Sequence, residues 1–374
     1  MSVIEQGATL GVLGGGQLGR MFVEAAHRLG YGVSVLAAES GSPAGQIADF
    51  ETIGNAENAA EVVRFAQSVA ALTFENELVP WESLLAASDV TTVRPGPYAL
   101  RVAQDRILQR RFLTELDLPV ARFSVLERGG DLEGPVSALT FPVCLKSARS
   151  GYDGRGQWWA HRADELLSAW SRLDFRPVLV EERVDLEVEF SVILARGADG
   201  AVVTYEPIEN VHSEGVLDTS KCPSGISAET AAAARKVAET IACRLDIVGV
   251  LATEFFVTAN GQLLINEFAV RPHNSGHLTI EACQTSQFEQ QVRALVGLPL
   301  GCPALVSAGA MTNLLGPWQP LAPPESLPPL ATLHGYGKEP APRRKMGHIT
   351  ALGDNPAGAL RAARVAREMV TRGT

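Results

Sequence analysis

Residues 248–270 read VGVLATEFFVTANGQLLINEFAV, two apolar runs joined by Asn260-Gly261. Asn-Gly is the preferred pair for a two-residue type I′ turn, so the pattern predicts a β-hairpin. Taking these two residues as the loop and counting back along both arms places Glu254 opposite Glu267. Like charges directly across two strands destabilise a sheet. Because both arms are apolar on both faces, the two carboxylates are also expected to be desolvated.

A divalent cation would offset this repulsion. Carboxylate oxygens at a partly hydrated site suit Mg²⁺, which commonly bridges the phosphates of a substrate. The alternative is that one acid is protonated, or that Arg or Lys side chains pair with the acids. Asn266 would point to the other face of an ideal strand, so a role for it at the same metal requires a local irregularity.

Groups suited to a nucleotide lie upstream of the hairpin. Lys146 ends the apolar run FPVCLK (141–146), an unfavourable place for a cation without an anionic partner such as a phosphate. The segment GYDGRGQ (151–157) lets the backbone turn tightly and present N–H groups to phosphate oxygens. The apolar strand VLVEE (178–182) ends in carboxylates, and Glu189 follows. A flexible turn, a lysine that reaches solvent and a solvated strand end are the competing structural interpretations.

The first hundred residues alternate strands (10–13, 33–37, 70–74) with helices (17–29, 58–69), which predicts a parallel sheet covered by helices. Further helices are expected at 98–116, 228–245 and 280–296, and further strands at 141–146, 157–160, 178–182 and 188–194. A proline-rich stretch, 317–329, leads to a small C-terminal unit.

Gly14-x-Gly16-x-x-Gly19 follows the first strand and opens a helix, with Glu39 about twenty residues further on. This pattern fits a dinucleotide-binding turn, and its alternative is a tight strand-to-helix turn without a ligand. In either case the helix N-terminus is expected to offer N–H groups to an anion. An NAD-dependent oxidoreductase is an alternative function that rests on this motif alone.

Bulk properties exclude several classes of protein. The 374 residues carry a formal charge of −10, which argues against nucleic-acid binding. No apolar run approaches the roughly 18 residues of a membrane span. The five cysteines are odd in number and are not paired at metal-ligand spacing, so reduced thiols in the cytoplasm are expected.

Several motifs together resemble the 5-(carboxyamino)imidazole ribonucleotide synthase family of ATP-grasp ligases. They are GGGQLGRM (14–21), TFENE (73–77), GYDGRGQ (151–157), NE (266–267), HNSGH (273–277), YGK (336–338) and RKMGH (344–348). The resemblance covers essentially the whole chain. Two positions depart from the family pattern: Val270 stands where a proline usually precedes the arginine, and Arg110 stands where a lysine often follows Arg106.

The resemblance implies an α/β and α+β fold. A Rossmann-like N-terminal domain (1–104) would precede an ATP-grasp domain (105–298, with a lid at about 118–184) and a small C-terminal domain (299–374). It also implies ATP, Mg²⁺ or Mn²⁺ in its place, bicarbonate and aminoimidazole ribonucleotide, no nucleic-acid or membrane partner, and a homodimer.

The family motifs assign roles to individual residues. Expected at ATP are Arg106, Lys146, Gly151, Tyr152, Asp153, Gly154, Arg155, Gly156, Gln157, Glu181, Glu182, Arg183, Val184, Glu189, His212, Asn266 and Glu267. Expected at the metal are Glu254 and Glu267. Tyr152, Arg155, Arg271 and His273 are the candidate catalytic residues. Gln17, Glu75, Arg271, Lys338, Arg344 and Lys345 are the candidates for the ribonucleotide.

The implied reaction is attack of bicarbonate on the γ-phosphate of ATP, followed by capture of the carboxyl group by the ribonucleotide amine. A related ATP-grasp ligase would share the acids and the glycine lid but would need a different anion site, which RKMGH (344–348) argues against. A non-catalytic binding protein is a further alternative, although paired buried acids are poor structural material.

Overall fold

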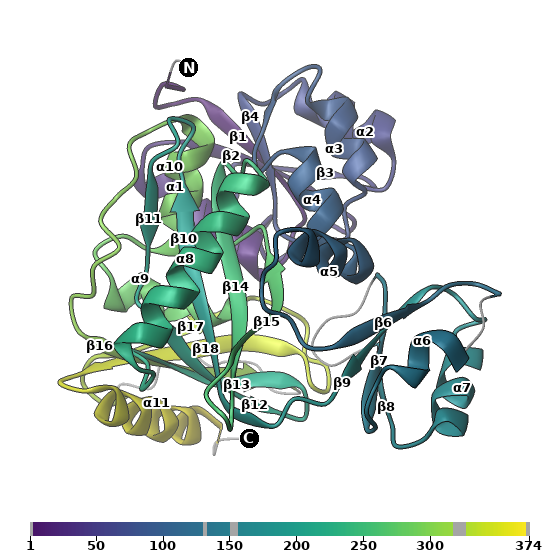
Figure 1. Cartoon of the computed structure of the whole chain (residues 1–374). Coiled ribbons are helices and arrows are strands. Elements are labelled where there is room, and N and C mark those ends of the chain that lie inside the picture. Colours follow the sequence, from purple (N-terminus) through teal and green to yellow (C-terminus); the bar gives the residue numbers. More distant parts are fainter. Residues whose placement is uncertain (1–2, 130–132, 150–155, 317–326, 372–374) are drawn as a thin grey trace.

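The N-terminal part of the chain is a parallel sheet. The computed structural model describes residues 3–129, 133–149, 156–316 and 327–371. The strands lie in the order β3-β2-β1-β4-β5, and the helices that follow them cover the sheet (Figure 1). The bounds are β1 (Thr9–Leu13), α1 (Gln17–Arg28), β2 (Gly32–Ala37), β3 (Phe50–Ile53), α2 (Ala59–Ala66), β4 (Ala71–Phe74), α3 (Trp81–Ala87) and β5 (Thr92–Val93). This order confirms the predicted Rossmann-like sheet.

The predicted helix 98–116 is two helices, α4 (Pro97–Ala103) and α5 (Arg106–Glu115). The break lies at Asp105, whose side chain accepts hydrogen bonds from the N–H groups of Ile107 and Leu108 and so begins a new helix. The prediction of one helix was wrong at this point. The break places Arg106 in the first turn of α5.

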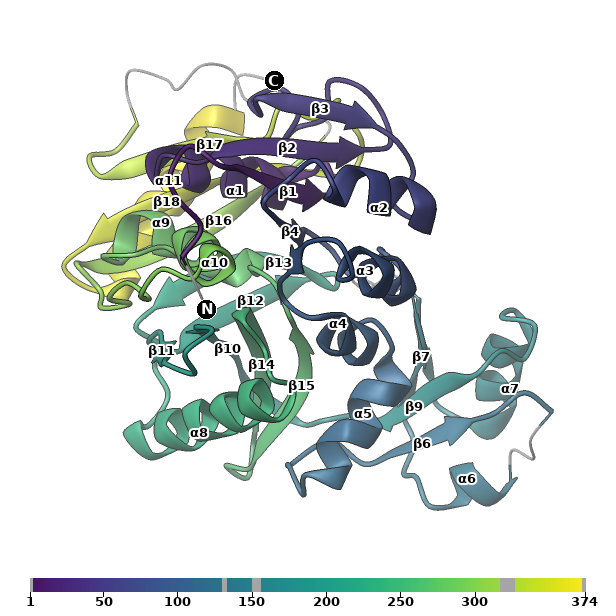
Figure 2. The same ribbon diagram turned by 90° about the horizontal axis from the view of Figure 1, so that it is seen from above.

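A small antiparallel sheet, which we call the lid sheet, extends away from the N-terminal sheet (Figure 2). Its order is β6-β9-β7-β8, with bounds β6 (Phe123–Leu126), β7 (Val143–Ser147), β8 (Gln157–Ala160) and β9 (Val178–Glu182). The helices α6 (Glu133–Ser137) and α7 (Ala163–Ser171) belong to the same unit. The predicted strands 157–160 and 178–182 are confirmed residue for residue.

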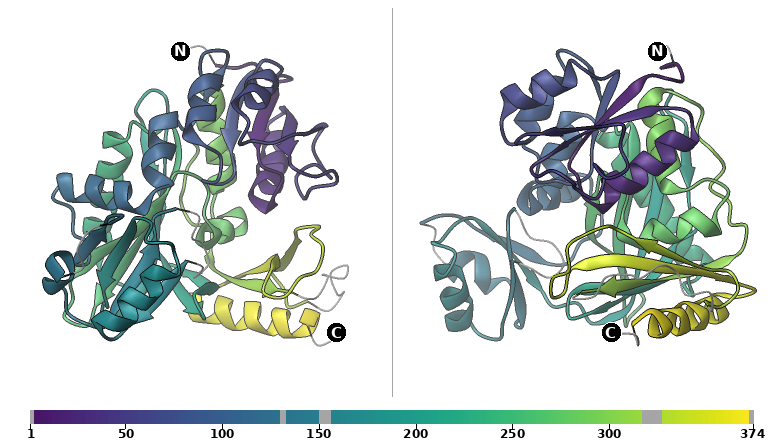
Figure 3. Two further views of the ribbon diagram at one scale, coloured as in Figure 1. Left: turned by 90° about the vertical axis from the view of Figure 1, so that its right-hand side faces the viewer. Right: turned by 180° about the vertical axis from the view of Figure 1, so that it is seen from behind.

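The rest of the chain forms one larger antiparallel sheet in the order β15-β14-β10-β12-β13-β16-β18-β17, with β11 beside β10. Its strands are β10 (Leu186–Arg196), β11 (Val202–Thr204), β12 (Ile208–Ser213), β13 (Val216–Cys222), β14 (Gly249–Thr258), β15 (Leu263–Ala269), β16 (Ala308–Leu315), β17 (Ala331–Gly335) and β18 (Lys345–Gly353). The C-terminal strands β16, β17 and β18 therefore continue this larger sheet, and α11 (Pro356–Thr371) packs on β16 and β18 (Figure 3). The domain boundaries given above stay predictions.

The two faces of β10 and β14 differ in chemistry. Phe190, Val192 and Phe255 point to one side, where they share a buried core with α8 (Ala228–Arg244). The alternate positions Glu189, Ser191 and Glu254 therefore lie on the opposite face. This polar face carries the candidate site.

The segment after β15 turns through η1 (Asn274–Leu278) into α9 (Thr279–Ala282) and α10 (Gln287–Val296). The predicted helix 280–296 was wrong as one element, because Ser286 caps a new helix by accepting from the N–H of Glu289. Helix α10 packs against α1, so it joins the N-terminal sheet to the larger sheet.

No helix in the described ranges is long and apolar enough to cross a membrane. All five cysteines fall within those ranges, and none forms a disulfide.

Candidate active site

The hairpin β14–β15 pairs Glu254 with Glu267, as predicted. The turn differs, because Gly261 N–H donates to Thr258 O (2.8 Å) and Thr258 N–H donates to Gln262 O (2.9 Å), so the loop has three residues. A type I′ turn needs a positive φ at both central residues, but of Asn260 and Gly261 only Gly261 has one, 81°. The longer loop shifts the register by one residue, and a bulge at Asn266 shifts it back.

The bulge is the local irregularity that a role for Asn266 requires. Its side-chain Nδ2 lies 3.3 Å from Glu254 Oε2, and His273 Nε2 lies 2.9 Å from Glu254 Oε1. Burial alone would raise the pKa of Glu254, but His273 beside it holds that pKa below its usual range. The prediction that Glu267 is desolvated was wrong, since its side chain is 42% exposed. Arg106 Nε lies 3.8 Å from Glu267 Oε2.

These groups fit a magnesium ion that also binds phosphate. Over the described ranges no group of three or more His, Cys, Asp or Glu side chains could hold a metal. Two carboxylates, those of Glu254 and Glu267, are instead paired across the hairpin. Mg²⁺ commonly takes one or two carboxylates together with the phosphates of a substrate. The arrangement thus suits a metal that arrives with a nucleotide.

Lys146 has an anionic partner within the chain, which the sequence did not reveal. Its Nζ lies 2.6 Å from Glu181 Oε2, and Arg110 pairs with Glu181 Oε1. Burial alone would raise the pKa of Glu181, but these two cations lower it to about 2. The side chain of Glu181 is thus committed to Lys146 and Arg110, and Lys146 is held at the end of β7.

The connection between the lid sheet and the larger sheet contains the other residues expected at ATP. Glu182 accepts a hydrogen bond from Thr140 N–H (2.7 Å) within the lid, and Arg183 N–H donates to Pro142 O (3.1 Å). Val184 follows Arg183 without regular structure and leads into β10. This segment presents backbone groups where two sheets meet, a suitable place to hold an adenine.

His212 on β12 pairs with Glu189 on β10. Burial alone would lower the pKa of His212, but the hydrogen bond and charge of Glu189 raise it, as does the charge of Glu254. The structure therefore brings Glu189, His212 and Glu254 to one polar face.

The glycine turn after β1 holds a carboxylate from its own chain. Gly16 N–H donates to Glu75 Oε1 (2.6 Å) and Gly19 N–H to Glu75 Oε2 (2.8 Å). A Cβ at Gly14 would lie 2.4 Å from the Glu75 side chain, so the glycines make room for it. Burial raises the pKa of Glu75, against these hydrogen bonds and the charge of Lys338. Two of the N–H groups expected to meet an external anion, those of Gly16 and Gly19, are thus taken by Glu75, which weakens the oxidoreductase alternative.

Arg271 lies near acids of both the hairpin and the glycine turn. Its Nε donates to Glu77 Oε2 (2.7 Å), a partner that the motif TFENE (73–77) contains but that was not predicted. Burial alone would lower the pKa of Arg271, but the charges of Glu77, Glu267 and Glu75 raise it. The Arg271 guanidinium is therefore close both to Glu267 of the hairpin and to Glu75 of the glycine turn.

The connection between β17 and β18, and the start of β18, add further cations. Lys338 Nζ donates to Gln17 at the start of α1, which brings these two predicted residues together. Lys345 begins β18, and its charge opposes the rise in the pKa of His212. Arg344 is exposed, and its Nη1 donates to Glu339 O (3.1 Å).

A chain of buried polar groups behind His273 was also missed. His273 Nδ1 lies 2.9 Å from Ser275 Oγ, which lies 2.6 Å from Ser191 Oγ. Asn210 Nδ2 donates to Ser191 Oγ (3.2 Å), and Ser220 Oγ donates to Asn210 Oδ1 (2.8 Å). This series of hydrogen bonds fixes the orientation of the His273 ring. Its members come from β10, β12, β13 and η1, so no local pattern in the sequence predicts their contacts.

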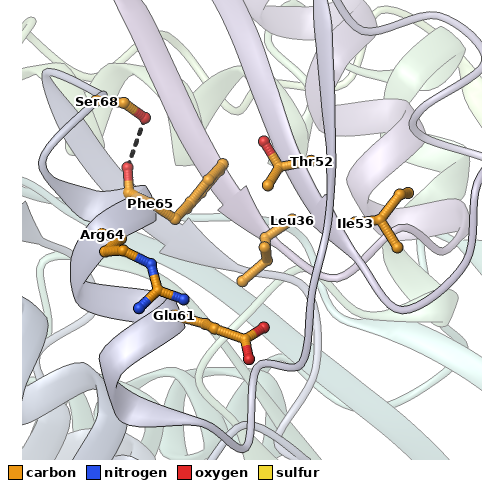
Figure 4. Close-up of a pocket in the computed structure, with 7 residues that line it drawn as sticks. All are labelled: Leu36, Thr52, Ile53, Glu61, Arg64, Phe65 and Ser68. Atoms are coloured by element: carbon orange, nitrogen blue, oxygen red, sulfur yellow. Dashed lines mark hydrogen bonds between the residues drawn. The ribbon is translucent and has the colours of Figure 1, made fainter.

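The glycine loop is only partly described. Gly151, Tyr152, Asp153, Gly154 and Arg155 lie outside the described residues, so their roles stay predictions. Gly156 O accepts from Ser147 N–H (2.9 Å), and Gln157 pairs with Lys146 across β7 and β8. A pocket between β3 and α2 contains none of the predicted site residues (Figure 4); it is lined by Leu36, Thr52, Ile53, Glu61, Arg64, Phe65 and Ser68.

Three parts of the chain match models of known protein families. Residues 7–104 match a ribonucleotide synthetase preATP-grasp domain, 111–288 an ATP-grasp domain, and 309–362 a phosphoribosylaminoimidazole carboxylase C-terminal domain. The N5-carboxyaminoimidazole ribonucleotide synthase of Brucella melitensis is 40% identical over 352 residues, 93% of this chain and 97% of that protein. The Bacillus subtilis protein of the same name is 36% identical, over 93% of this chain and 92% of that protein.

Solved structures agree with these relatives. An ADP complex of an N5-carboxyaminoimidazole ribonucleotide synthetase superposes with a TM-score of 0.91 at 34% identity, covering 100% of this chain and 99% of that one. The Aspergillus clavatus N5-carboxyaminoimidazole synthase with ADP and 5-aminoimidazole ribonucleotide gives 0.89 at 30% identity, covering 98% and 99%. With this fold, this placement of acids and cations, and relatives of this identity over nearly its full length, the chain belongs to the N5-carboxyaminoimidazole ribonucleotide synthase family of ATP-grasp ligases.

Proposed function

We propose that the chain carboxylates 5-aminoimidazole ribonucleotide with bicarbonate and ATP, giving N5-carboxyaminoimidazole ribonucleotide, ADP and phosphate. The pairing of Glu254 with Glu267 carries this proposal, because it sets two carboxylates on the polar face that also holds Glu189. The names of the relatives and the nucleotide complexes of the solved structures support it.

The reaction has two steps. A bicarbonate oxygen attacks the γ-phosphorus of ATP, the bond to the bridging oxygen breaks, and ADP leaves. The carboxyphosphate then transfers its carboxyl group, directly or as CO₂, to the amino nitrogen of the ribonucleotide, which loses a proton as phosphate departs.

Residues of this chain meet the demands of the first step. Charge grows on the phosphoryl oxygens, so the cations Lys146 and Arg271 stabilise the transition state. His273 would orient bicarbonate once Glu254, which now pairs with its ring, turns to the metal. Mg²⁺, or Mn²⁺ in its place, would be held by Glu254 and Glu267 and would neutralise phosphate charge.

The second substrate fits between the glycine turn and the C-terminal strands. Lys338, Arg344 and Lys345 offer cations for its 5′-phosphate. Gln17 and Glu75 lie next to Lys338 and offer an amide and a carboxylate. A protein working on these small molecules in the cytoplasm fits the five unpaired cysteines, and we propose a homodimer from the family resemblance.

The test is release of ADP and phosphate from ATP with Mg²⁺ and bicarbonate, with and without the ribonucleotide. Strong stimulation by the ribonucleotide, with phosphate formed in step, is expected. ADP release without stimulation would leave an ATP-grasp ligase with another substrate. No ADP release from folded protein would refute the proposal, and light scattering of the purified protein tests the dimer.

A further inference from the structure

Arg110 joins two parts of the candidate site that belong to different sheets. It lies on α5 with a side chain that is 4% exposed. Its Nη1 donates to Ile265 O (3.1 Å) and its Nη2 to Asn266 O (2.8 Å), both on β15. The same Nη2 pairs with Glu181 on β9 of the lid sheet. One guanidinium thus satisfies acceptors on both sides of the site.

The two carbonyl contacts explain the bulge in β15. In a regular strand the backbone groups of successive residues point to opposite edges. Ile265 faces the outer edge, since its N–H donates to Pro119 O (2.8 Å), so Asn266 would ordinarily face β14. The carbonyl of Asn266 instead turns outward beside that of Ile265, and Arg110 donates a hydrogen bond to each of the two carbonyl oxygens. Two adjacent carbonyls on one edge of a strand require such a bulge.

The bulge in turn arranges the metal acids. Without it, the three-residue turn would place Glu267 one residue out of register with Glu254. With it, the two acids are directly paired, and the Asn266 amide reaches Glu254 at 3.3 Å. On the lid sheet, Arg110 pairs with Glu181, and Glu181 in turn holds Lys146, whose Nζ lies 2.6 Å from Glu181 Oε2.

We propose that Arg110 is a positioning residue that fixes the bulge at Asn266 and so sets the affinity of the site for Mg²⁺ bound with a nucleotide. The inference rests on the proposed metal role of Glu254 and Glu267. A planar guanidinium holds three acceptors in a fixed fork, whereas a lysine ammonium is a single compact centre. A lysine at 110 would keep a cation for Glu181 but could not hold both carbonyls in the same way.

The experiment compares Arg110→Met and Arg110→Lys with the parent chain. The readout is the Mg²⁺ concentration at which ADP binding, followed by calorimetry and by the thermal shift of the full chain, reaches half its Mg²⁺-dependent gain. We expect a rise of about tenfold for Arg110→Met, in the range seen when groups that orient metal ligands are removed, and a smaller rise for Arg110→Lys. Arg111→Met is the matched control, because Arg111 is 54% exposed on the same helix and pairs at the surface with Glu127.

A purely structural role would lower the melting temperature of Arg110→Met and leave its Mg²⁺ requirement equal to that of the parent, which would overturn the proposal. If Arg110→Met does not fold, Arg110→Lys decides by the same criterion. A parent chain whose ADP binding ignores Mg²⁺ would also overturn it. Because no ribonucleotide or bicarbonate is present, a failure of the proposed carboxylation is detected separately.

Discussion

At the scale of single residues, a substitution of Glu267 tests its proposed role at the metal separately from any role in stability. Its side chain is 42% exposed, so its removal leaves little buried surface unfilled. We expect Glu267→Ala to keep the free energy of unfolding within about 1 kcal/mol of the parent. Its turnover should fall by roughly 100-fold at moderate Mg²⁺ and recover partly at high Mg²⁺. Glu187→Ala, an exposed acid at the start of β10, is the control. Near-normal turnover with unchanged Mg²⁺ dependence would refute the metal assignment.

Glu181 predicts a pH-dependent stability. Its pKa of about 2 in the folded chain lies below the usual value of 4.5, so its contribution is present above pH 4.5 and is lost as the pH falls toward 2. A shift of this size corresponds to ~3 kcal/mol near neutral pH. We expect Glu181→Gln to be less stable than the parent at pH 7, and the gap to narrow by ~1 kcal/mol at pH 3.5 in urea unfolding. A constant gap would contradict this. Glu127→Gln, in a surface pair, should show no gap.

At the scale of elements, local patterns predicted two strands residue for residue but missed the breaks within two helices. The ranges 157–160 and 178–182 are strands with the predicted bounds. The predicted helices 98–116 and 280–296 are each divided, because Asp105 and Ser286 cap new helices from within sequences of otherwise helical character. Side-chain capping competes with helix continuation, and composition alone does not show which prevails.

The hairpin shows a correct pairing reached from an incorrect turn. Glu254 pairs with Glu267 because the bulge at Asn266 offsets the longer loop. The contacts that hold the bulge come from Arg110, more than 150 residues earlier in the chain, so no local pattern could have predicted them. The pairing of Lys146 with Glu181 was missed for the same reason.

This division of roles predicts the effect of Gly261→Ala. Gly261 has a φ of 81°, and a Cβ there would meet nothing within 4 Å, so the cost is backbone strain alone. We expect a loss of about 1 kcal/mol in the free energy of unfolding. Mg²⁺-dependent ADP binding should be unchanged, because the bulge and not the turn aligns the acids. Gly96→Ala, at a φ of −67°, is the control. Loss of Mg²⁺-dependent binding in Gly261→Ala would show that the turn sets the register.

At the scale of the whole molecule, the candidate site is assembled from distant parts of the chain. The start of α1 contributes Gln17, the hairpin contributes Glu254, and the connection between β17 and β18 contributes Lys338. Gln17 and Lys338 meet across 321 positions of sequence. Family motifs named both residues, but physical reasoning from the sequence could not bring them together. The larger sheet does so by continuing from the hairpin to β17 and β18.

In such an assembly, single substitutions should weaken the binding of the ribonucleotide and of the nucleotide separately. Lys338 lies with Gln17 and Glu75, whereas Lys146 lies in the lid sheet with Glu181. We expect Lys338→Met to raise the KM for the ribonucleotide by about 10- to 100-fold, the loss of one charge-assisted contact to a phosphate, and to leave ADP affinity unchanged. Lys146→Met should do the reverse. Initial rates and calorimetry with ADP measure both. A fall in ADP affinity in Lys338→Met would place that lysine at the nucleotide, and the basic C-terminal strands would then serve ATP and not the ribonucleotide.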